Sequence, residues 1–437
     1  MVDLAESTAA DEAPAGYRMT ELGLLPEDWG VEHLADVAEF SKKERGADIT
    51  GSIPFIPMTL LPESGLYVDH WEDRAREEVR SGVYFRDGDL LLAKITPCLE
   101  NGKQGIARGI PGGWGYATTE VYPIHGTAVL TEYLAYYLRH QPVRNHLVDR
   151  MEGSTGRQRL PKSVVENLPI PLPPLPEQRA IAHVLSTVQR AREATEAVIA
   201  ATRELKRSLM RHLFLYGPVP VDQVAGVRLK ETEIGLVPEG WEVQALGSVA
   251  VQTQYGLSVR GEKVGRYPIL RMNSLQGGQI LIDDLQYVDL DVQNAAKFML
   301  RQGDVIFNRT NSFDLVGKTA LFDLLGDYVF ASYLVRLTVD RESVDPAWIN
   351  QYLNWTPTQI RLKGLASRGV SQSNISASKL RTLPIPLPPL AEQEATTRRL
   401  CALDRKLEVD KRRLRSLDET LRTTLHNLMT GAMRVPW

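Results

Sequence analysis

The sequence predicts an α+β protein with two globular domains in tandem pseudo-repeat, joined by two long antiparallel coiled-coil helices. Three observations predict this fold. The chain repeats itself once at a spacing of about 215 residues, each copy ends in a proline-rich connector, and each connector leads into a long segment with a seven-residue apolar period. A spacing this long indicates duplication of a whole domain and not a solenoid of short repeats.

The repeat is clearest at the two ends of each copy. Residues 20–31, TELGLLPEDWGV, recur at 232–243 as TEIGLVPEGWEV, with eight of twelve positions identical. Residues 168–180, LPIPLPPLPEQRA, recur at 383–395 as LPIPLPPLAEQEA, with eleven of thirteen identical. The same register joins Gly88 to Gly303, Gly102 to Gly317 and Tyr137 to Tyr352. The rest of the two copies has diverged.

Each copy has the same predicted order of elements. Short apolar runs bounded by Gly, Pro, Asn and Asp indicate strands at 53–61, 88–94 and 121–124, and at 267–272, 303–307 and 333–339. Shorter helices are expected around 131–151 and 346–365. The connectors, 168–176 and 383–390, are expected to be extended because proline fixes φ and lacks a backbone donor.

The long helices carry the apolar seams. Residues 177–213 contain no Gly or Pro, and at about 1.5 Å per residue they form a rod of roughly 55 Å. Gly217 and Gly431 are the expected C-terminal caps. Apolar side chains at alternating spacings of three and four residues predict coiled-coil packing, in which Thr195 and Asp410 are polar interruptions. The predicted seam includes Val188, Thr195, Leu205, Leu209, Leu403, Leu407, Asp410, Leu414, Leu417 and Leu421.

These elements predict six segments: a disordered tail at 1–19, a first globular domain at 20–165, and a connector with the central helix at 166–217. A second globular domain at 218–380, a connector with the C-terminal helix at 381–431 and a short tail at 432–437 follow. Because the two helices each have a seam, their simplest arrangement is antiparallel packing against each other.

Overall composition is close to a globular average, with 43% hydrophobic and 24% charged residues. The net charge of −3 and the pI near 6.3 argue mildly against a nucleic-acid partner. The distribution of charge removes that objection. Residues 177–217 hold seven Lys and Arg against four acids, and residues 392–437 hold ten against seven, so positive charge concentrates on the helices.

Several classes of protein are disfavoured. Cys98 and Cys401 are 303 positions apart, so no disulfide framework is expected, and a cytoplasmic location fits. No histidine pair has metal-ligand spacing, and we expect no metal site. The N-terminus has no apolar signal region, and no apolar run is long enough to span a membrane.

The doubled connector followed by Glu-Gln, at 168–178 and 383–393, resembles the specificity (S) subunits of type I restriction–modification systems. The resemblance covers residues 20 to about 431. It implies that each globular domain is a target recognition domain for one part of a split, asymmetric DNA site. It also implies that the helices set the distance between the two parts, which a rod of about 55 Å limits to roughly 16 base pairs.

The resemblance further implies the partners and cofactors. We expect double-stranded DNA, two methyltransferase (M) subunits and restriction/translocase (R) subunits as partners, and no membrane. S-adenosylmethionine, ATP and Mg are expected on the partner subunits, with no cofactor in this chain. The alternative is a non-catalytic tandem coiled-coil scaffold whose globular halves bind protein or another ligand.

Two pairs of loops are the candidate DNA contacts. Lys94 and Arg309 occupy the same slot after a predicted strand, and Arg and Asn are the commonest readers of guanine and adenine. The second pair consists of polar, Gly/Ser-rich loops before each connector. Surface loops held by their own turns are the alternative. The candidates are Lys94, Thr96, Asn101, Lys103, Arg157, Gln158, Arg159, Arg309, Asn311, Lys318, Arg368, Ser371, Gln372 and Asn374.

No motif predicts catalysis by this chain. The Gly317-Lys318-Thr319 sequence invites a P-loop interpretation, but Ser312 stands where the first glycine is required. We find neither the glycine loop and amino-group clamp of an adenine methyltransferase nor a nucleophile triad. The chain is therefore expected to be non-catalytic by itself, within a type I restriction and adenine-N6 methyltransferase complex.

Overall fold

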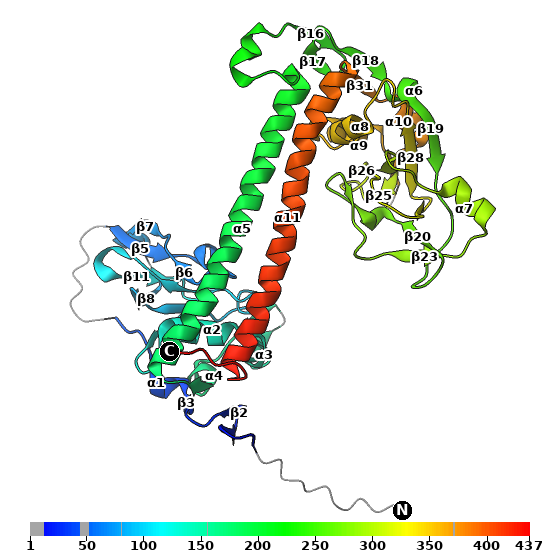
Figure 1. Ribbon diagram of the computed structural model, residues 1–437. Helices are drawn as coiled ribbons and strands as arrows, with labels where there is room; N and C mark the ends of the chain where they lie inside the picture. The colour runs from blue at the N-terminus through cyan, green and yellow to red at the C-terminus, as the bar shows by residue number, and fades with distance from the viewer. Residues whose placement is uncertain (1–12, 44–51, 80, 155, 370–371) are drawn as a thin grey trace, which may run out of the picture. The chain divides into compact units, whose positions relative to one another are not determined.

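The computed structural model describes residues 13–43, 52–79, 81–154, 156–369 and 372–437 (Figure 1). The chain forms two compact units. Unit 1 contains residues 1–198 and 410–437, and unit 2 contains residues 199–409. The division differs from the six expected segments because it cuts through both long helices. Each unit therefore consists of one globular part, the beginning of one long helix and the end of the other.

The globular part of unit 1 is built on two sheets. A five-stranded sheet has the order β4-β12-β9-β10-β6, and a four-stranded sheet has the order β7-β5-β11-β8. The strands of the first are β4 (Ala38–Phe40), β12 (Val121–Gly126), β9 (Leu90–Ala93), β10 (Gln104–Ala107) and β6 (Tyr67–Val68). Those of the second are β7 (Glu72–Ala75), β5 (Ser52–Ile56), β11 (Trp114–Ala117) and β8 (Val83–Arg86).

Unit 2 repeats this plan. Its four-stranded sheet has the order β19-β28-β24-β26, which matches β4-β12-β9-β10 strand for strand, and a second sheet has the order β23-β20-β27. The strands are β19 (Ala250–Tyr255), β28 (Leu334–Val339), β24 (Val305–Asn308), β26 (Thr319–Leu321), β23 (Gln286–Val288), β20 (Tyr267–Leu270) and β27 (Val329–Phe330). A smaller hairpin joins β21 (Leu275–Gln276) to β22 (Gln279–Ile280). All six predicted strand regions contain strands.

Each predicted shorter-helix region holds two helices. These are α2 (Thr131–Arg139) and α3 (Gln141–Val148) in unit 1, and α8 (Pro346–Leu353) and α9 (Thr356–Leu365) in unit 2. Non-helical ψ angles at His140 and Trp355 separate the two helices of each pair, and a proline stands at the start of the second helix in both. The remaining short helices are α1 (Leu34–Val37), α4 (Lys162–Glu166), α6 (Leu246–Val249), α7 (Val292–Phe298) and α10 (Ala377–Arg381).

The proline connectors are extended, as predicted. Among the described strands, β15 (Pro169–Leu172) pairs only with β3 (Gly30–His33), and β31 (Pro384–Leu387) pairs only with β18 (Glu242–Ala245). Their prolines lack donors, but the carbonyl groups accept hydrogen bonds from aromatic side chains. Tyr133 Oη donates to Pro171 O over 2.9 Å, and Trp348 Nε1 donates to Pro386 O over 2.9 Å. These bonds attach each connector to the first helix of its helix pair.

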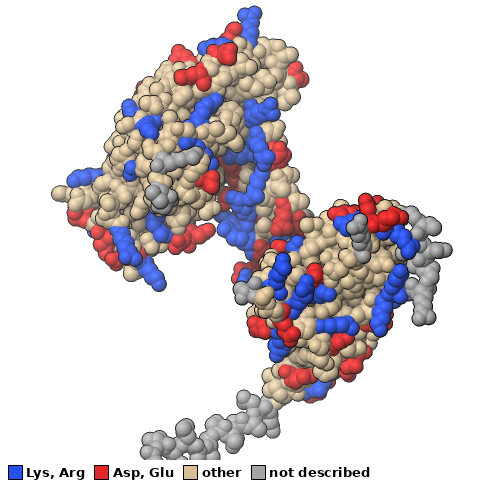
Figure 2. Space-filling model, turned by 180° about the vertical axis from the view of Figure 1, so that it is seen from behind, with Lys and Arg blue, Asp and Glu red and all other residues tan. Residues whose placement is uncertain are grey.

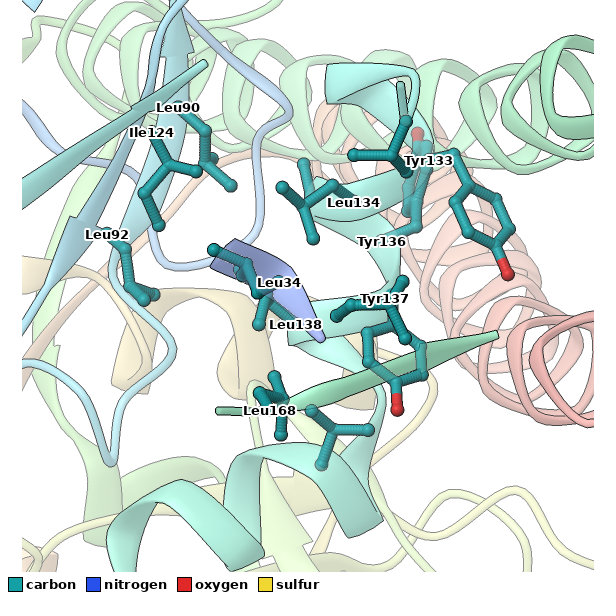
Figure 3. Packing of buried hydrophobic residues seen from close by; sticks show 14 of the residues in the cluster. Leu34, Leu90, Leu92, Ile124, Tyr133, Leu134, Tyr136, Tyr137, Leu138 and Leu168 are labelled. Carbon is teal, nitrogen blue, oxygen red and sulfur yellow. The ribbon is translucent and has the colours of Figure 1, made fainter. Parts of the chain in front are cut away.

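The core of unit 1 joins the sheet, the connector and both long helices. Figure 3 shows Leu90, Leu92 and Ile124 from the sheet facing the α2 side chains Leu134 and Leu138. The same cluster includes residues of the long helices α5 (Leu175–Tyr216) and α11 (Leu390–Met429), among them Leu185 and Leu428. The globular part is thus packed onto the helices through a shared core.

The long helices are antiparallel within each unit. In unit 1, Arg192 on α5 pairs with Asp418, while Glu177, near the start of α5, pairs with Arg434 after α11. In unit 2, Lys206 pairs with Asp404, and Arg399 donates to the carbonyl of Pro218 after α5. Gly217 and Gly431 have positive φ of 80° and 67° at the helix ends, as expected for C-terminal caps.

Most of the predicted seam lies between the helices, but Leu205 was placed wrongly. Leu205 is 56% exposed, because Lys206 occupies the interface and its Nζ lies 2.5 Å from Asp404 Oδ1. Thr195, Leu407 and Asp410 are buried. The half-buried members are Val188, Leu209, Leu403, Leu414, Leu417 and Leu421.

Both expected tails need correction where the structure describes them. Residues 1–12 lie outside the described residues, but strand β1 (Tyr17–Thr20) pairs with β2 (Gly23–Pro26), and β16 (Leu229–Thr232) pairs with β17 (Gly235–Pro238) in the same way. At the other end, the guanidinium of Arg434 pairs with Asp28 and Glu177. Short-range apolar patterns gave no signal for the Arg434 contacts, because these join distant parts of the chain through charged groups.

Candidate nucleic-acid interface

The Glu-Gln pair after each connector holds the long helix to its globular part. In unit 1, Trp29 Nε1 donates to Glu177 Oε2 over 3.1 Å, and the Gln178 side chain accepts from Leu130 N over 2.8 Å. Gln178 Nε2 also donates to the carbonyl of Pro173 over 2.9 Å. Because both side chains are buried and bonded, the pair fixes where the connector becomes a helix.

Unit 2 makes the same bonds. Trp241 Nε1 donates to Glu392 Oε2 over 3.0 Å, and Gln393 accepts from Asp345 N over 3.0 Å and donates to Pro388 O over 2.8 Å. This shared network explains why the entry tryptophan and the Glu-Gln pair are present in both copies. It attaches each long helix to its globular part in the same way.

In unit 1 the structure brings the two predicted loops together. Strands β13 (Glu152–Ser154) and β14 (Arg157–Arg159) form a hairpin, and Arg159 makes an isolated β-bridge with Ile95 in the loop after β9. The backbone N–H of Thr96 donates to Gln158 O over 3.1 Å. Loops about 60 positions apart in the sequence thus form one surface.

Three predicted cations of this surface are already engaged inside unit 1. The Arg159 guanidinium makes a bidentate pair with Glu120 at 2.9 and 2.8 Å, which lowers the pKa of the Glu120 carboxyl. Lys103 Nζ donates to the carbonyl of Met58 over 3.1 Å. Lys94 Nζ lies 4.7 Å from the centre of the Tyr122 ring, and burial lowers the pKa of Lys94.

The remaining candidates differ in accessibility. Asn101 and Arg157 are exposed, and neither side chain takes part in a hydrogen bond or ion pair found among the described residues. Gln158 is half-buried. The Thr96 hydroxyl is buried and has no hydrogen-bond partner in the described part of the chain. Arg157 and Asn101 are therefore the candidates in unit 1 best placed to contact a ligand.

Unit 2 repeats this arrangement with different side chains. Strand β30 (Ser373–Asn374) lies between β25 (Thr310–Asn311) and β29 (Ser367–Arg368). Thr310 pairs with Asn374, at the positions that correspond to Ile95 and Arg159 in unit 1. The structure therefore joins the second pair of predicted loops as well.

Arg309 is the best-positioned cation of this second surface. Its Cζ lies 4.6 Å from the centre of the Tyr255 ring, and its Nη1 donates to Ser332 O over 3.4 Å. The backbone N–H of Arg309 donates to Tyr333 O over 3.0 Å. Because Tyr255 and Tyr333 are 42% and 45% exposed, this surface combines a guanidinium with accessible aromatic rings.

The other candidates in unit 2 have varied surroundings. Asn311 Oδ1 accepts from Ser312 N over 2.8 Å in a local turn, and Asn374 Nδ2 donates to Thr310 Oγ1 over 2.7 Å. Lys318 is half-buried, and Gln372 is exposed. Arg368 lies in β29, and Ser371 lies outside the described residues.

A hollow of about 510 Å³ beside Arg309 adds residues that the sequence reasoning missed. Ser332 and Tyr333 line it together with Arg260, Arg271 and Asn273. The carboxylate of Asp284 holds Arg271 and Asn273 at 2.8 and 2.9 Å. Gln286 also lines the hollow. Arg, Asn and Gln are the residue types that bind base edges with two hydrogen bonds. The repeat gave no signal for Arg271, Asn273 and Gln286, because Ile56, Met58 and Trp71 stand at the corresponding positions of the first copy.

The structure argues against the P-loop interpretation of residues 312–319. A P-loop connects a strand to a helix, whose N-terminus faces the phosphates. Here Lys318 is followed by strand β26, which returns antiparallel to β24. In the part of the chain that the structure describes, no group of three or more His, Cys, Asp or Glu is placed to hold a metal. None of the described helices is long and apolar enough to cross a membrane.

Figure 2 shows Lys and Arg intermingled with Asp and Glu on the globular surfaces. The interface candidates are therefore identified by their geometry and residue types. The decisive observation comes from comparison with known proteins. The family model described as "Type I restriction modification DNA specificity domain" matches residues 26–201 and 238–419.

The chain belongs to this family. The model matches once per repeat and covers most of both copies. Among curated relatives, a putative type I restriction enzyme MjaX specificity subunit from Methanocaldococcus jannaschii is 25% identical, over 96% of this chain and 97% of the relative. The type I restriction enzyme EcoEI specificity subunit from Escherichia coli is 26% identical, over 84% of this chain and 76% of the relative.

A solved structure agrees on the fold. The crystal structure of a type I restriction–modification system S subunit from M. genitalium is similar with a TM-score of 0.61 and 14% identity. The alignment covers 92% of this chain and 96% of that one. Family membership makes this chain a DNA specificity subunit of a type I restriction–modification system, whose part in the complex is recognition and not catalysis.

Proposed function

We propose that the two units read the two halves of a bipartite, asymmetric DNA target, each through its pair of joined loops. The observation that carries this proposal is the duplicated loop pairing, Ile95 with Arg159 and Thr310 with Asn374, on matching scaffolds. The framework is shared while the side chains on it differ. Two equivalent surfaces with different side chains are suited to two different half-sites.

The side chains suggest how each half is read. In unit 1, Arg157 and Asn101 are accessible and uncommitted, so they contact phosphates or base edges, while Arg159 and Lys103 shape the loops. In unit 2, Arg309 and the lining of the neighbouring hollow offer several bidentate donors. Phosphate contacts position a protein on DNA, whereas contacts with base edges determine the sequence that it selects.

The same proposal covers the complex. Two methyltransferase subunits and restriction/translocase subunits dock on this chain, and S-adenosylmethionine, ATP and Mg belong to those partners. The chain is thus recognition machinery in the cytoplasm, where its free Cys98 and Cys401 stay reduced. Arg412 and Arg413 are exposed on α11, where they can contact DNA or the partners.

An exchange of residues 20–165 for those of another family member tests whether each unit recognises one half of the target independently. Single-molecule sequencing of methylated adenines in cells that carry the complex reports the target. We expect one half of the bipartite motif to change and the other half to persist. A chimera that changes both halves, or neither half while methylation continues, contradicts the proposal.

A matched exchange of residues 218–380 serves as the control, and should alter only the other half. Deletion of the gene should remove the motif altogether. If the motif survives deletion, this chain does not determine it, and the result favours the alternative function as a scaffold.

A further inference from the structure

Unit 1 contains a cavity of about 750 Å³ that the DNA-recognition proposal does not use. It lies where α2 and α3 meet the parts of α5 and α11 that belong to unit 1. Four different helices each contribute an arginine to it: Arg139, Arg144, Arg192 and Arg422. A volume of this size is typical of sites for small molecules.

The positive charge of this cavity is not balanced by its own walls. Two carboxylates, Glu63 and Asp418, are among the lining groups, and Asp418 is bound by Arg192 over 2.5 Å. Arg422 takes part in no hydrogen bond or ion pair found among the described residues. The surplus favours a ligand that brings negative charge.

Arg139 provides a more specific indication. Its terminal nitrogens donate to the backbone carbonyls of Ser64, Gly65 and Gln104, and no carboxylate pairs with it among the described ion pairs. Burial lowers the pKa of Arg139 to about 10, because its charge is poorly solvated. An anion in the cavity would relieve this cost.

Two polar atoms beside the cavity have no partner in the described part of the chain. They are Arg139 Nε and the hydroxyl of Tyr136, a residue that is 2% exposed. Buried polar groups are nearly always hydrogen-bonded, so atoms left without a partner call for an explanation such as an absent ligand or water. Both residues line the cavity, and Tyr136 also lines a neighbouring hollow of about 550 Å³.

We propose that this cavity binds a small organic phosphate of mononucleotide size. The guanidinium fork matches the geometry of phosphate oxygens, and arginines on separate helices surround the space from several sides. Pro142, Leu421 and Leu425 supply apolar contacts for the organic part of the ligand.

The second copy shows that this cavity is not part of the shared framework. Asn354 and Trp355 stand at the positions of Arg139 and His140 in the 215-residue register. Trp355 packs against Phe214 with ring centres 5.1 Å apart, and Asn354 Nδ2 donates to the carbonyl of Thr319 over 3.1 Å. Internal contacts thus satisfy in unit 2 the positions that line a cationic cavity in unit 1.

Calorimetric titration of the full chain with AMP tests the proposal, with adenosine and inorganic phosphate as separate probes. AMP should bind, and each of the two fragments should bind at least about tenfold more weakly, because each makes only part of the contacts. Arg422→Ala and Arg144→Ala should each weaken AMP binding by about tenfold, as expected for loss of a charge-assisted hydrogen bond. Arg412→Ala, which removes an exposed cation on the same helix outside the cavity, should leave affinity unchanged.

Circular dichroism and thermal melting of each variant check that the fold is retained, and two solvent-accessible arginine sites are tested because either single variant could fail to fold. Absence of AMP binding at millimolar concentration overturns the proposal, as does equal binding by the Arg422→Ala and Arg412→Ala variants. If Arg157→Ala loses AMP binding and Arg422→Ala does not, AMP binds at the DNA interface. That result also overturns the proposal.

Discussion

The indole N–H of Trp29 donates a 3.1 Å hydrogen bond to the carboxylate of Glu177, which is fully buried. Arg434 binds the same carboxylate at 2.6 and 2.7 Å. In the equivalent bond of unit 2, Trp241 donates to Glu392, and no arginine binds that carboxylate among the described contacts. One junction between connector and helix is therefore reinforced by an ion pair, and the other is not.

Glu177→Gln should destabilise unit 1 by about 2 kcal/mol, because it weakens two charge-assisted hydrogen bonds from Arg434, which is partly exposed and stays paired with Asp28. Glu392→Gln, the matched change in unit 2, should cost about 1 kcal/mol, the value of an ordinary hydrogen bond. Hydrogen exchange measured by mass spectrometry separates the two units by their peptides. Equal loss of protection in both variants would show that the ion pair with Arg434 adds nothing.

Arg309→Lys should alter recognition of one half-site. Lysine keeps the charge but loses the planar fork and its stacking on Tyr255, so discrimination at the bases that Arg309 reads should fall by about 1–3 kcal/mol. Methylation sequencing should show relaxed bases in one half of the motif only. A uniform loss of DNA binding without any change in motif would instead indicate a phosphate contact.

Arg157→Ala and Arg159→Ala should differ in unit 1. The Arg157 variant should reduce DNA affinity of the assembled complex while leaving stability unchanged, because its side chain is exposed and makes no hydrogen bond or ion pair with the described residues. Arg159→Ala removes the bidentate pair with Glu120 and should loosen the loop itself. Gel shifts at several salt concentrations, alongside thermal melting, distinguish the two. Identical behaviour of the variants contradicts the assignment of roles.

Removing one partner of the Lys206–Asp404 pair should cost more stability than replacing both. Asp404 also accepts from Gln351 over 2.7 Å, so Asp404→Ala leaves Lys206 unpaired inside the helix interface and should cost about 3 kcal/mol. The double variant Lys206→Leu with Asp404→Leu should recover most of that loss by extending the apolar seam. Urea unfolding of unit 2 gives the comparison, and a double variant less stable than Asp404→Ala would refute it.

Stability of unit 1 should fall in mild acid. His140 Nε2 lies 3.0 Å from His426 Nδ1, and burial with the neighbouring imidazole lowers the pKa of His140 from 6.5 to about 4. The unfolded chain therefore takes up this proton at a higher pH than the folded chain does. Between pH 6.5 and 4 stability should decrease by about 1–3 kcal/mol, the lower values applying where water screens the site. His140→Gln should flatten that part of the stability profile, and an unchanged profile would exclude His140 as the cause.

The sequence alone predicted the large-scale architecture well, because a duplicated connector and a heptad pattern are strong local signals. The heptad pattern placed Leu205 in the interface between the helices. The interface residue is its charged neighbour Lys206, which a search for apolar residues at spacings of three and four passes over. The sequence reasoning also missed Arg260 and Asn273, which reach the surface near Arg309 only through the folding of unit 2. The ends of the chain gave no signal because Arg434 meets Asp28 across 406 positions.

The division of each long helix between two units also sets the order in which the protein can be completed during synthesis. Unit 2 is one continuous stretch, 199–409, so all of its parts have been translated before residue 410. Unit 1 begins first but needs residues 410–437, which are translated only after the whole of unit 2. The core of unit 1 therefore stays open to solvent, where Leu428 and Met429 will pack, until the end of α11 has been made. A premature stop after residue 409 would spare the later half of the protein and leave the earlier half unfinished.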